Sequence, residues 1–181
     1  FPTEKYSIVP GYNVDCLKFE NYFKQFNFEL SNFQKWSIYS IINNDNTLVT
    51  AHTGSGKTLP AEFAIQYFTS LGKKVIYTSP IKALSNQKFF EFTQKYKNLS
   101  IGILTGDNKH NPEADVIVMT TEILRNQLLS LIPKTNDNEI PVHEINQFSM
   151  DIEKDCGIVI FDEIHYIDDP DRGAVWEQSI M

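Results

Sequence analysis

Residues 51–58 combine glycines with a lysine and a threonine in the order Ala-His-Thr-Gly-Ser-Gly-Lys-Thr. This order is typical of a loop that binds phosphate when a strand precedes it and a helix follows it. Glycines let the backbone wrap closely around phosphate oxygens, and the start of a helix adds partial positive charge. The Lys57 ammonium would bridge the β- and γ-phosphates of a nucleotide, and the Thr58 hydroxyl would bind Mg²⁺. We expect the phosphates to contact Thr53, Gly54, Ser55, Gly56, Lys57 and Thr58.

Two adjacent carboxylates follow a second apolar segment further along the chain. Residues 156–161 predict a buried strand, and Asp162 and Glu163 come directly after it. Asp162 would hold Mg²⁺ through water, and Glu163 would orient and deprotonate an attacking water molecule. Taken alone, such a pair could simply cap a helix. Together with the phosphate loop, it indicates an enzyme that hydrolyses a nucleoside triphosphate.

The alternation of strand-like and helix-like segments predicts an α/β fold. Apolar segments predict strands over 47–51, 74–79, 100–104, 115–120 and 156–161. Amphipathic patterns predict helices over 33–42, 57–67, 83–96, 122–131 and 174–181. Such an order favours a parallel sheet with helices on both faces, which binds ligands at the carboxyl ends of its strands. The chemistry is expected just after Ala51, Ser79, Thr120 and Phe161.

The composition favours one globular domain. The chain has 181 residues, of which 41% are hydrophobic and 22% charged, enough for one core and too few for two. No apolar run approaches the roughly 20 residues that cross a bilayer, and no apolar leader follows Phe1. Cys16 and Cys156 are far apart in the sequence and are expected to be free thiols. We expect an intracellular protein of the cytoplasm or nucleus (or of the host cell, if viral) with no membrane partner.

The net charge of −7 is distributed unevenly. Residues 1–133 carry 13 basic and 11 acidic side chains, whereas residues 134–181 carry 3 and 12. The acidity therefore does not exclude a polyanionic partner on the first three-quarters of the chain. Two further segments lie outside the α/β pattern. Residues 1–27 are aromatic-rich and predict an N-terminal extension. Residues 134–155 are polar and predict a surface insertion between strands or, alternatively, a hairpin.

Several motifs together carry a resemblance to a known family. Residues 162–165, Asp-Glu-Ile-His, form a DExH box, which marks superfamily 2 helicases. Residues 77–88, Tyr-Thr-Ser-Pro-Ile-Lys-Ala-Leu-Ser-Asn-Gln-Lys, resemble motif Ia of the superkiller-type RNA helicases, the group that feeds RNA to the exosome. Residues 105–107 resemble motif Ib, and residues 119–125 and 171–177 match the blocks that follow. The resemblance covers residues 26–181 and implies a first RecA-like motor domain, a P-loop NTPase fold with a parallel sheet flanked by helices.

The resemblance also implies how the nucleotide is bound and used. Phe28 would stack on adenine and the Gln34 amide would pair with the adenine edge, so that ATP is favoured over GTP. Ser31 stands where the family usually has Asp. His165 would couple the hydrolysis site to the RNA-binding face, although it could also be an ordinary surface residue. The implied catalytic residues are Lys57, Asp162, Glu163 and His165, with ATP and Mg²⁺ as cofactors and Thr58 and Asp162 as metal ligands.

RNA contacts are implied along motif Ia and the blocks after it. They would involve small, hydroxyl and amide groups that grip a sugar-phosphate backbone without reading bases. Lys82 and Arg125 could instead be solvated surface residues, and the hydroxyls could cap helices. The implied set is Pro80, Lys82, Ala83, Asn86, Gln87, Thr105, Gly106, Asp107, Thr120, Thr121 and Arg125.

Helicases of this family use two RecA-like domains, and the second supplies an arginine finger. We therefore expect residues 28–181 to be a partial first motor domain that lacks the motif III strand. Its partners would be single-stranded RNA, a second RecA-like domain in the same longer chain, and RNA-decay complex proteins. As an isolated polypeptide it is expected to be marginally folded and not a competent helicase. Two alternatives remain: a DNA translocase of the same superfamily, and a non-catalytic fragment that binds nucleotide or RNA.

Overall fold

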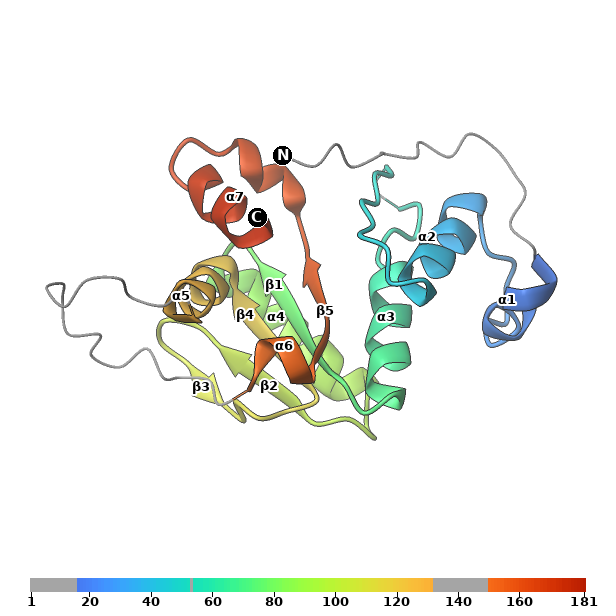
Figure 1. Cartoon of the computed structure of the whole chain (residues 1–181), viewed down its shortest axis with the longest axis horizontal. Helices are drawn as coiled ribbons and strands as arrows, with labels where there is room; N and C mark the ends of the chain where they lie inside the picture. Colours follow the sequence, from blue (N-terminus) through green and yellow to red (C-terminus); the bar gives the residue numbers. More distant parts are fainter. Residues whose placement is uncertain (1–15, 53, 132–149) are drawn as a thin grey trace, which may run out of the picture. The chain divides into compact units, whose positions relative to one another are not determined.

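A computed structural model describes residues 16–52, 54–131 and 150–181 of the chain (Figure 1). The chain divides into two compact units, residues 1–64 and 65–181, and the boundary falls within helix α3. The first unit contains the phosphate-loop sequence. The second unit contains the sheet and the acidic pair.

The described part of the first unit is helical. It contains α1 (Cys16–Phe23), α2 (Asn32–Ile42) and the beginning of α3 (Leu59–Ser70). Aromatic side chains join these helices: the ring centroid of Phe19 lies 4.9 Å from that of Tyr39, and Tyr22 lies 6.1 Å from Phe63. Edge-to-face pairs of this kind add about 0.5–1.5 kcal/mol each to ordinary burial. The aromatic residues of α1 therefore pack against both α2 and α3.

The second unit is built on a five-stranded sheet with the order β3-β2-β4-β1-β5. Its strands are β1 (Lys74–Ser79), β2 (Ile101–Leu104), β3 (Lys109–His110), β4 (Val116–Thr120) and β5 (Cys156–Phe161). All neighbouring pairs are parallel except β2 and β3. The four parallel strands consequently end at the same edge of the sheet, which is where ligands bind in folds of this class.

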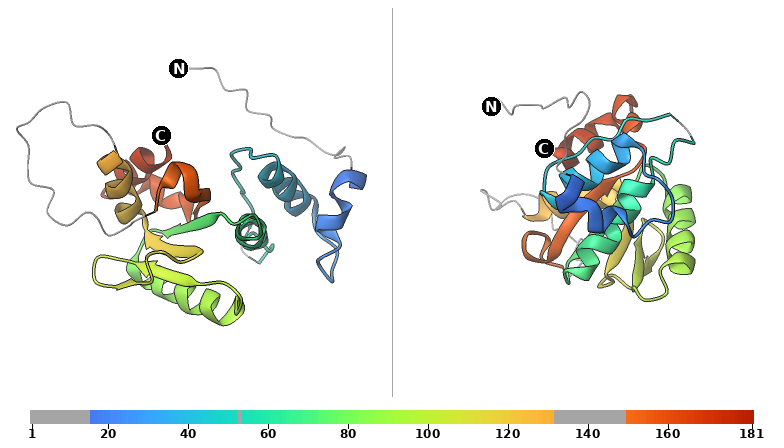
Figure 2. Two further views of the ribbon diagram at one scale, coloured as in Figure 1. Left: turned by 60° about the horizontal axis from the view of Figure 1, so that its bottom comes forward. Right: turned by 90° about the vertical axis from the view of Figure 1, so that its right-hand side faces the viewer.

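Helices cover both faces of this sheet. The helices of the second unit are α4 (Lys82–Lys95), α5 (Thr121–Leu131), α6 (Ile152–Asp155), the 3-10 helix η1 (Ile164–Asp168) and α7 (Gly173–Ile180). Figure 2 shows α4 on one face of the sheet and α5 and α7 on the other. Side chains agree with this view, because Tyr77 of β1 packs against Phe92 of α4, whereas Phe161 of β5 packs against Trp176 of α7.

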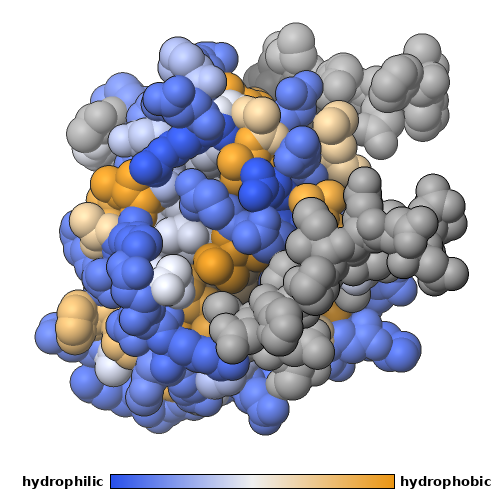
Figure 3. All heavy atoms as spheres, turned by 90° about the vertical axis from the view of Figure 1, so that its left-hand side faces the viewer, coloured by the Kyte–Doolittle hydropathy of each residue, from blue (hydrophilic) through white to orange (hydrophobic). Residues whose placement is uncertain are grey.

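The coloured surface in Figure 3 is mostly hydrophilic, and its hydrophobic side chains gather in separate groups. Large exposed hydrophobic side chains include Phe28 in the first unit and Phe90 on α4 in the second. None of the described helices is both long enough and apolar enough to cross a membrane.

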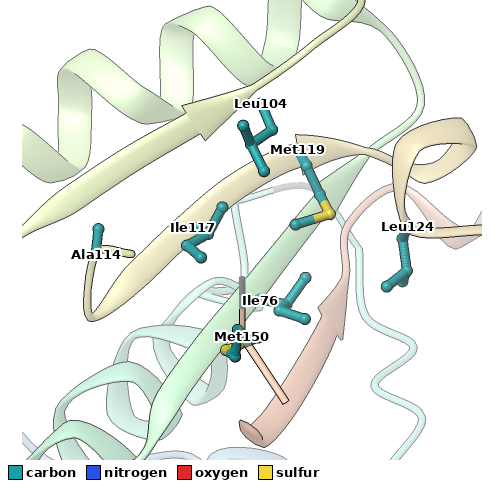
Figure 4. Close-up of a cluster of buried hydrophobic side chains, with 7 residues drawn as sticks. All are labelled: Ile76, Leu104, Ala114, Ile117, Met119, Leu124 and Met150. Carbon is teal, nitrogen blue, oxygen red and sulfur yellow. The ribbon is translucent and has the colours of Figure 1, made fainter. Parts of the chain in front are cut away.

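The hydrophobic core of the second unit lies between the sheet and α5. Figure 4 shows this cluster, which joins Ile76 of β1, Leu104 of β2, Ile117 and Met119 of β4, and Leu124 of α5, together with Ala114 and Met150. Each large apolar side chain buried in this way contributes about 1.5–3 kcal/mol relative to an exposed one. The cluster fixes β1 and β4 in the middle of the sheet and so fixes the position of the loops that follow them.

The predicted fold class is confirmed, because a mainly parallel sheet is flanked by helices on both faces. The strands predicted over 74–79 and 156–161 have their observed bounds, and those over 100–104 and 115–120 begin one residue later. The helices predicted over 33–42, 83–96, 122–131 and 174–181 are present within about one residue at either end. Helices α1 and α6, the short strand β3 and the 3-10 helix η1 were not predicted.

The strand predicted over 47–51 is wrong. Residues 45–52 have no regular secondary structure, and the sheet contains no strand from them. A strand is stable only when a neighbour pairs with its backbone groups, and none of the five strands of the described sheet pairs with residues 47–51. Leu48 is accordingly 72% exposed instead of buried. The helix predicted over 57–67 begins two residues later, as α3 at Leu59.

Two predicted segments fall partly outside the described residues. Of the extension over 1–27, the structure describes only residues 16–27, which include α1. Of the insertion over 134–155, it describes only residues 150–155, which include α6. Cys156 is a free thiol, as predicted, and burial raises its pKa.

Candidate functional site

The phosphate loop has the backbone geometry that its glycines predict. Gly54 has a φ of +84° and Gly56 a φ of +80°, a region that favours glycine. Between them, the Ser55 hydroxyl donates to the His52 carbonyl at 2.7 Å and closes the turn. Within the described residues, the backbone N–H groups of Gly54, Gly56 and Lys57 donate to no protein acceptor. The loop therefore presents donors that fit a phosphate group. Thr53 lies outside the described residues.

Gln34 is attached to this loop by its side chain. The residue is 6% exposed, and its Nε2 donates to the Gly56 carbonyl at 3.1 Å. Its Oε1 accepts a hydrogen bond of 2.9 Å from the Ser31 N–H at the start of α2. Both ends of the amide therefore bond to backbone within the first unit. One N–H and one oxygen lone pair remain for the predicted adenine contact.

Phe28 has the exposure that a stacking residue needs. Its side chain is 53% exposed and lies 5.8 Å from the ring of Phe26, measured between centroids. It lines a pocket of about 370 Å³ in the first unit, together with Glu20, Phe23, Lys24, Glu29, Leu30 and Lys35. The face of an aromatic ring at a pocket can receive a planar base.

The acidic segment begins directly at the end of β5. The Asp162 N–H donates to the Thr78 carbonyl at 3.0 Å, which extends the pairing of β5 with β1 by one residue. The two carboxylate oxygens of Asp162 also have fixed donors. Oδ2 accepts from the Tyr77 hydroxyl at 2.5 Å, and Oδ1 accepts from the Glu163 N–H at 3.0 Å. Burial, followed by the charge of Asp162, raises the pKa of Tyr77 far above its usual range, so that the phenol keeps its proton.

Glu163 turns the chain away from the sheet. Its φ of 56° and ψ of 46° place it in the left-handed region, which is uncommon for a residue other than glycine. Its side chain is half-exposed, and Oε2 lies 3.3 Å from Nδ1 of His165. The predicted coupling residue therefore contacts the predicted base.

The predicted RNA contacts in the second unit follow the carboxyl ends of β1, β2 and β4. The side chains of Lys82, Ala83 and Gln87 on α4 are exposed, as are Gly106 and Asp107 after β2. Asn86 and Arg125 are half-buried. The remaining four residues, Pro80, Thr105, Thr120 and Thr121, are buried in this conformation.

Two of the buried hydroxyls have structural partners. Thr105 Oγ1 accepts from the Asn108 N–H at 3.1 Å and closes the turn after β2. Thr121 Oγ1 donates to the Ser79 carbonyl at 3.4 Å and links the ends of β1 and β4. These hydroxyls therefore shape the loops from which exposed side chains can reach a ligand.

The charged members of the predicted RNA set also have protein partners. Lys82 Nζ lies 2.5 Å from Asp107 Oδ2, and both side chains are more than half exposed. The Arg125 guanidinium donates to Asn126 Oδ1 at 2.9 Å and 3.2 Å. An exposed pair such as Lys82 and Asp107 contributes little to stability, so its partners can be exchanged at small cost.

A model of the DEAD/DEAH box helicase family matches residues 31–181. The chain belongs to this family. Relatives of this helicase-family chain include the antiviral helicase SKI2 of Saccharomyces cerevisiae, 44% identical over 85% of the chain, and the superkiller complex protein 2 of Homo sapiens, 43% identical over 87%. The exosome RNA helicase MTR4 of Homo sapiens is 41% identical over 87% of the chain. The chain spans only 11–13% of the length of these three relatives. The resemblance predicted from the motifs is thus confirmed.

Two residues of this DEAD/DEAH-type chain have contacts that sequence reasoning missed. Tyr77 belongs to the motif Ia segment, but its contact with Asp162 depends on the pairing of β1 with β5. Arg172 follows η1, and its Nη1 donates to the Pro80 carbonyl at 2.5 Å, so that the segment after the DExH box is tied to motif Ia. Residue types alone could not identify either pair, because 85 and 92 positions separate their members.

Proposed function

We propose that this chain is the first motor domain of an ATP-dependent RNA helicase and that it couples ATP hydrolysis to RNA unwinding or translocation in the full-length protein. The observation that carries the proposal is the acidic segment, in which Asp162 and Glu163 follow β5 in a chain of the DEAD/DEAH box family. The phosphate loop, with its outward N–H donors, supports the same function.

The phosphate loop would hold the nucleotide. The N–H groups of Gly54, Gly56 and Lys57 and the Lys57 ammonium would stabilise negative charge on the phosphates. Thr53 and Ser55 would complete the contacts of the loop. Phe28 would stack on adenine and Gln34 would pair with its edge through the remaining N–H and lone pair. Gln34 would also connect base recognition to the loop, because it already bonds to Gly56.

The acidic segment would act on the same nucleotide. Bound ATP supplies the phosphoanhydride bond, and Mg²⁺ neutralises the phosphates. Thr58 and Asp162 would hold the metal ion, the latter through water. The Glu163 carboxylate would orient a water molecule and accept its proton. His165, 3.3 Å from Glu163, would transmit the state of this site towards the RNA-binding residues.

RNA would lie along the exposed residues that follow β1, β2 and β4, and the contacts would be made mainly to its backbone. Lys82, Gln87 and Gly106 are exposed there. Few charges are present, which suits binding without sequence preference. The buried predicted residues, Pro80, Thr105, Thr120 and Thr121, would contribute through backbone or after a change of conformation. Ala83, Asn86, Asp107 and Arg125 complete the proposed set.

Further partners are proposed for the full-length protein. A second RecA-like domain would supply an arginine finger. Because the relatives are named as superkiller and exosome helicases, proteins of an RNA-decay complex are proposed as further partners. An intracellular location, in the cytoplasm or nucleus, belongs to the same proposal.

ATP turnover of the full-length protein with and without single-stranded RNA tests this function. We expect RNA to stimulate turnover and Glu163→Gln to reduce the stimulated rate by about 10²–10⁴, the contribution of a general base. Nucleotide binding should persist in this variant. Equal stimulation by DNA of the same sequence would favour the DNA translocase, because only RNA has the 2′-hydroxyl. Nucleotide binding without any turnover by the wild type would favour a non-catalytic protein.

A further inference from the structure

We propose that Tyr77 is a positioning residue for Asp162: its hydroxyl holds the carboxylate in the orientation in which it binds the metal ion. This role rests on the proposed function, and it goes beyond it because Tyr77 has no assigned part in nucleotide binding. The argument depends on three features of the second unit: the strand register, the burial of Tyr77 and the pair of donors on Asp162.

The register of β1 and β5 places both side chains on the same face of the sheet. Tyr77 is paired with Ile160 in the parallel ladder. Side chains alternate along a strand, so Asp162, two residues beyond Ile160, points to the same face as Tyr77. The phenol ring can therefore extend along β5 and reach the carboxylate at the end of the strand.

Packing holds the ring of Tyr77 in place independently of the hydrogen bond that its hydroxyl makes. Tyr77 is 1% exposed, and its ring packs edge-to-face on Phe92 of α4 with 5.0 Å between centroids. A phenol held in this way has one hydroxyl proton to donate, and that proton is directed to Oδ2 of Asp162 at 2.5 Å. Packing alone would be served equally well by phenylalanine, which cannot make this bond.

The second donor completes the orientation of the carboxylate. The Glu163 N–H donates to Oδ1, so each oxygen of Asp162 receives one directed hydrogen bond. Two bonds on opposite oxygens fix the plane of the carboxylate, and each oxygen keeps a lone pair for a metal-bound water molecule. Partners of metal ligands that act in this way typically change metal affinity or activity by 10–100-fold when they are removed.

Tyr77→Phe in the full-length protein removes the hydroxyl and keeps the ring. The probe is Mn²⁺ with a non-hydrolysable ATP analogue, and the readout is free Mn²⁺ measured by electron paramagnetic resonance. We expect Mn²⁺ affinity in the presence of the analogue to fall about tenfold. Tyr96→Phe is the matched control, because Tyr96, the C-cap residue of α4, also packs on Phe92 and is not bonded to Asp162 in the proposed arrangement. Its affinity should equal that of the wild type.

A second variant separates positioning from packing. Asp162→Asn should weaken Mn²⁺ binding by itself, and adding Tyr77→Phe to it should cause little further loss, because Tyr77 acts through Asp162. Independent, additive losses would overturn the proposal, as would a Tyr77→Phe protein that melts like the wild type and binds Mn²⁺ equally well. A wild-type protein that binds no Mn²⁺-nucleotide would instead refute the proposed function, and the positioning role with it.

Discussion

The phosphate loop and the acidic segment are held in different ways. Around Gly54 and Gly56 the loop is closed by local bonds, and within the first unit its contact with a distant residue is the amide of Gln34. Asp162, by contrast, is bonded to the neighbouring strand through its backbone and to the buried Tyr77 through its side chain. The loop presents exposed donors to a ligand, whereas the acidic segment is ordered by the sheet before any ligand arrives. Changes in the loop should therefore act mainly on nucleotide binding, and changes near β5 mainly on the positioning of the Asp162 carboxylate.

The largest effect is expected from Lys57→Ala. Removing the ammonium leaves the phosphate charge without its side-chain donor, and loss of one such donor typically lowers kcat by about 10²–10³. Steady-state ATP turnover of the full-length protein measures this effect. Lys97→Ala, at an exposed lysine that follows α4, is a control for loss of a positive charge outside the proposed site. An equal loss of activity in both variants would mean that Lys57 has no special role.

Gly56→Ala should have the next largest effect. The backbone φ of +80° disfavours alanine, and the added Cβ would lie 2.7 Å from Nε2 of Gln34. We expect about 1–3 kcal/mol of lost stability and a nucleotide affinity at least tenfold weaker, as measured by titration with a fluorescent ATP analogue. Gly72→Ala is the matched control, because Gly72 has a φ of +71° but no atom close to its Cβ position. If Gly72→Ala lowers nucleotide affinity equally, the weaker binding of Gly56→Ala would be explained by its lost stability alone.

The thiol of Cys156 tests how firmly β5 is packed. Burial raises the pKa of Cys156 above its ordinary value, so the folded protein holds the proton that the unfolded chain releases. At pH 9 we expect iodoacetamide to alkylate this thiol at least several-fold more slowly in the folded protein than in urea, because the thiolate is the nucleophile. Mass spectrometry of the peptide containing residue 156 gives both rates. Equal rates would show that the strand carrying Asp162 opens readily.

The raised pKa of Cys156 also makes the free energy of unfolding depend slightly on pH. Since the folded pKa of Cys156 is raised, its contribution to stability is fully present below the unfolded pKa and is lost as the pH rises through and above it. A Cys156→Ala variant should lose less stability than the wild type between pH 8 and pH 10, as measured by urea unfolding.

The smallest effects are expected at the exposed pair of Lys82 and Asp107. Lys82→Ala should weaken RNA binding and reduce its salt dependence by about one unit of slope. Asp107→Asn should strengthen binding, because it releases the ammonium from its partner while the asparagine amide can still make the contact proposed for this position. Neither change should alter stability by more than about 1 kcal/mol. Fluorescence anisotropy with labelled RNA at several salt concentrations measures both, and weaker binding in Asp107→Asn would assign the carboxylate itself to the RNA contact.

Local patterns determined how much of this molecule could be predicted. The apolar segments 74–79 and 156–161 are bounded by polar residues and became strands with the expected limits. The glycines of the phosphate loop likewise predicted a closely wrapped backbone, and Gly54 and Gly56 have positive φ angles. Both features depend on residues that are adjacent in the sequence.

Features that depend on distant neighbours could not be predicted. The segment 47–51 has a strand-like composition, but a strand also needs a pairing partner, and composition does not supply one. The bond from Tyr77 to Asp162 required the register of β1 with β5, and the left-handed backbone of Glu163 has no signal in its residue type. The exposure of individual RNA candidates also followed from the turn after β2 and from the direct passage of β4 into α5, as the burial of Thr105 and Thr121 shows.

The central claim is that the phosphate loop and the acidic segment act on one nucleotide. A crystal structure of the full-length protein with Mg²⁺ and a non-hydrolysable ATP analogue tests it most directly. We expect the Lys57 ammonium to contact the γ-phosphate, and Thr58 and Asp162 to share a single Mg²⁺ ion, with Asp162 acting through water. A bound analogue whose γ-phosphate contacts Lys57 while Asp162 and Glu163 lie too far away to reach the same metal ion would contradict the account.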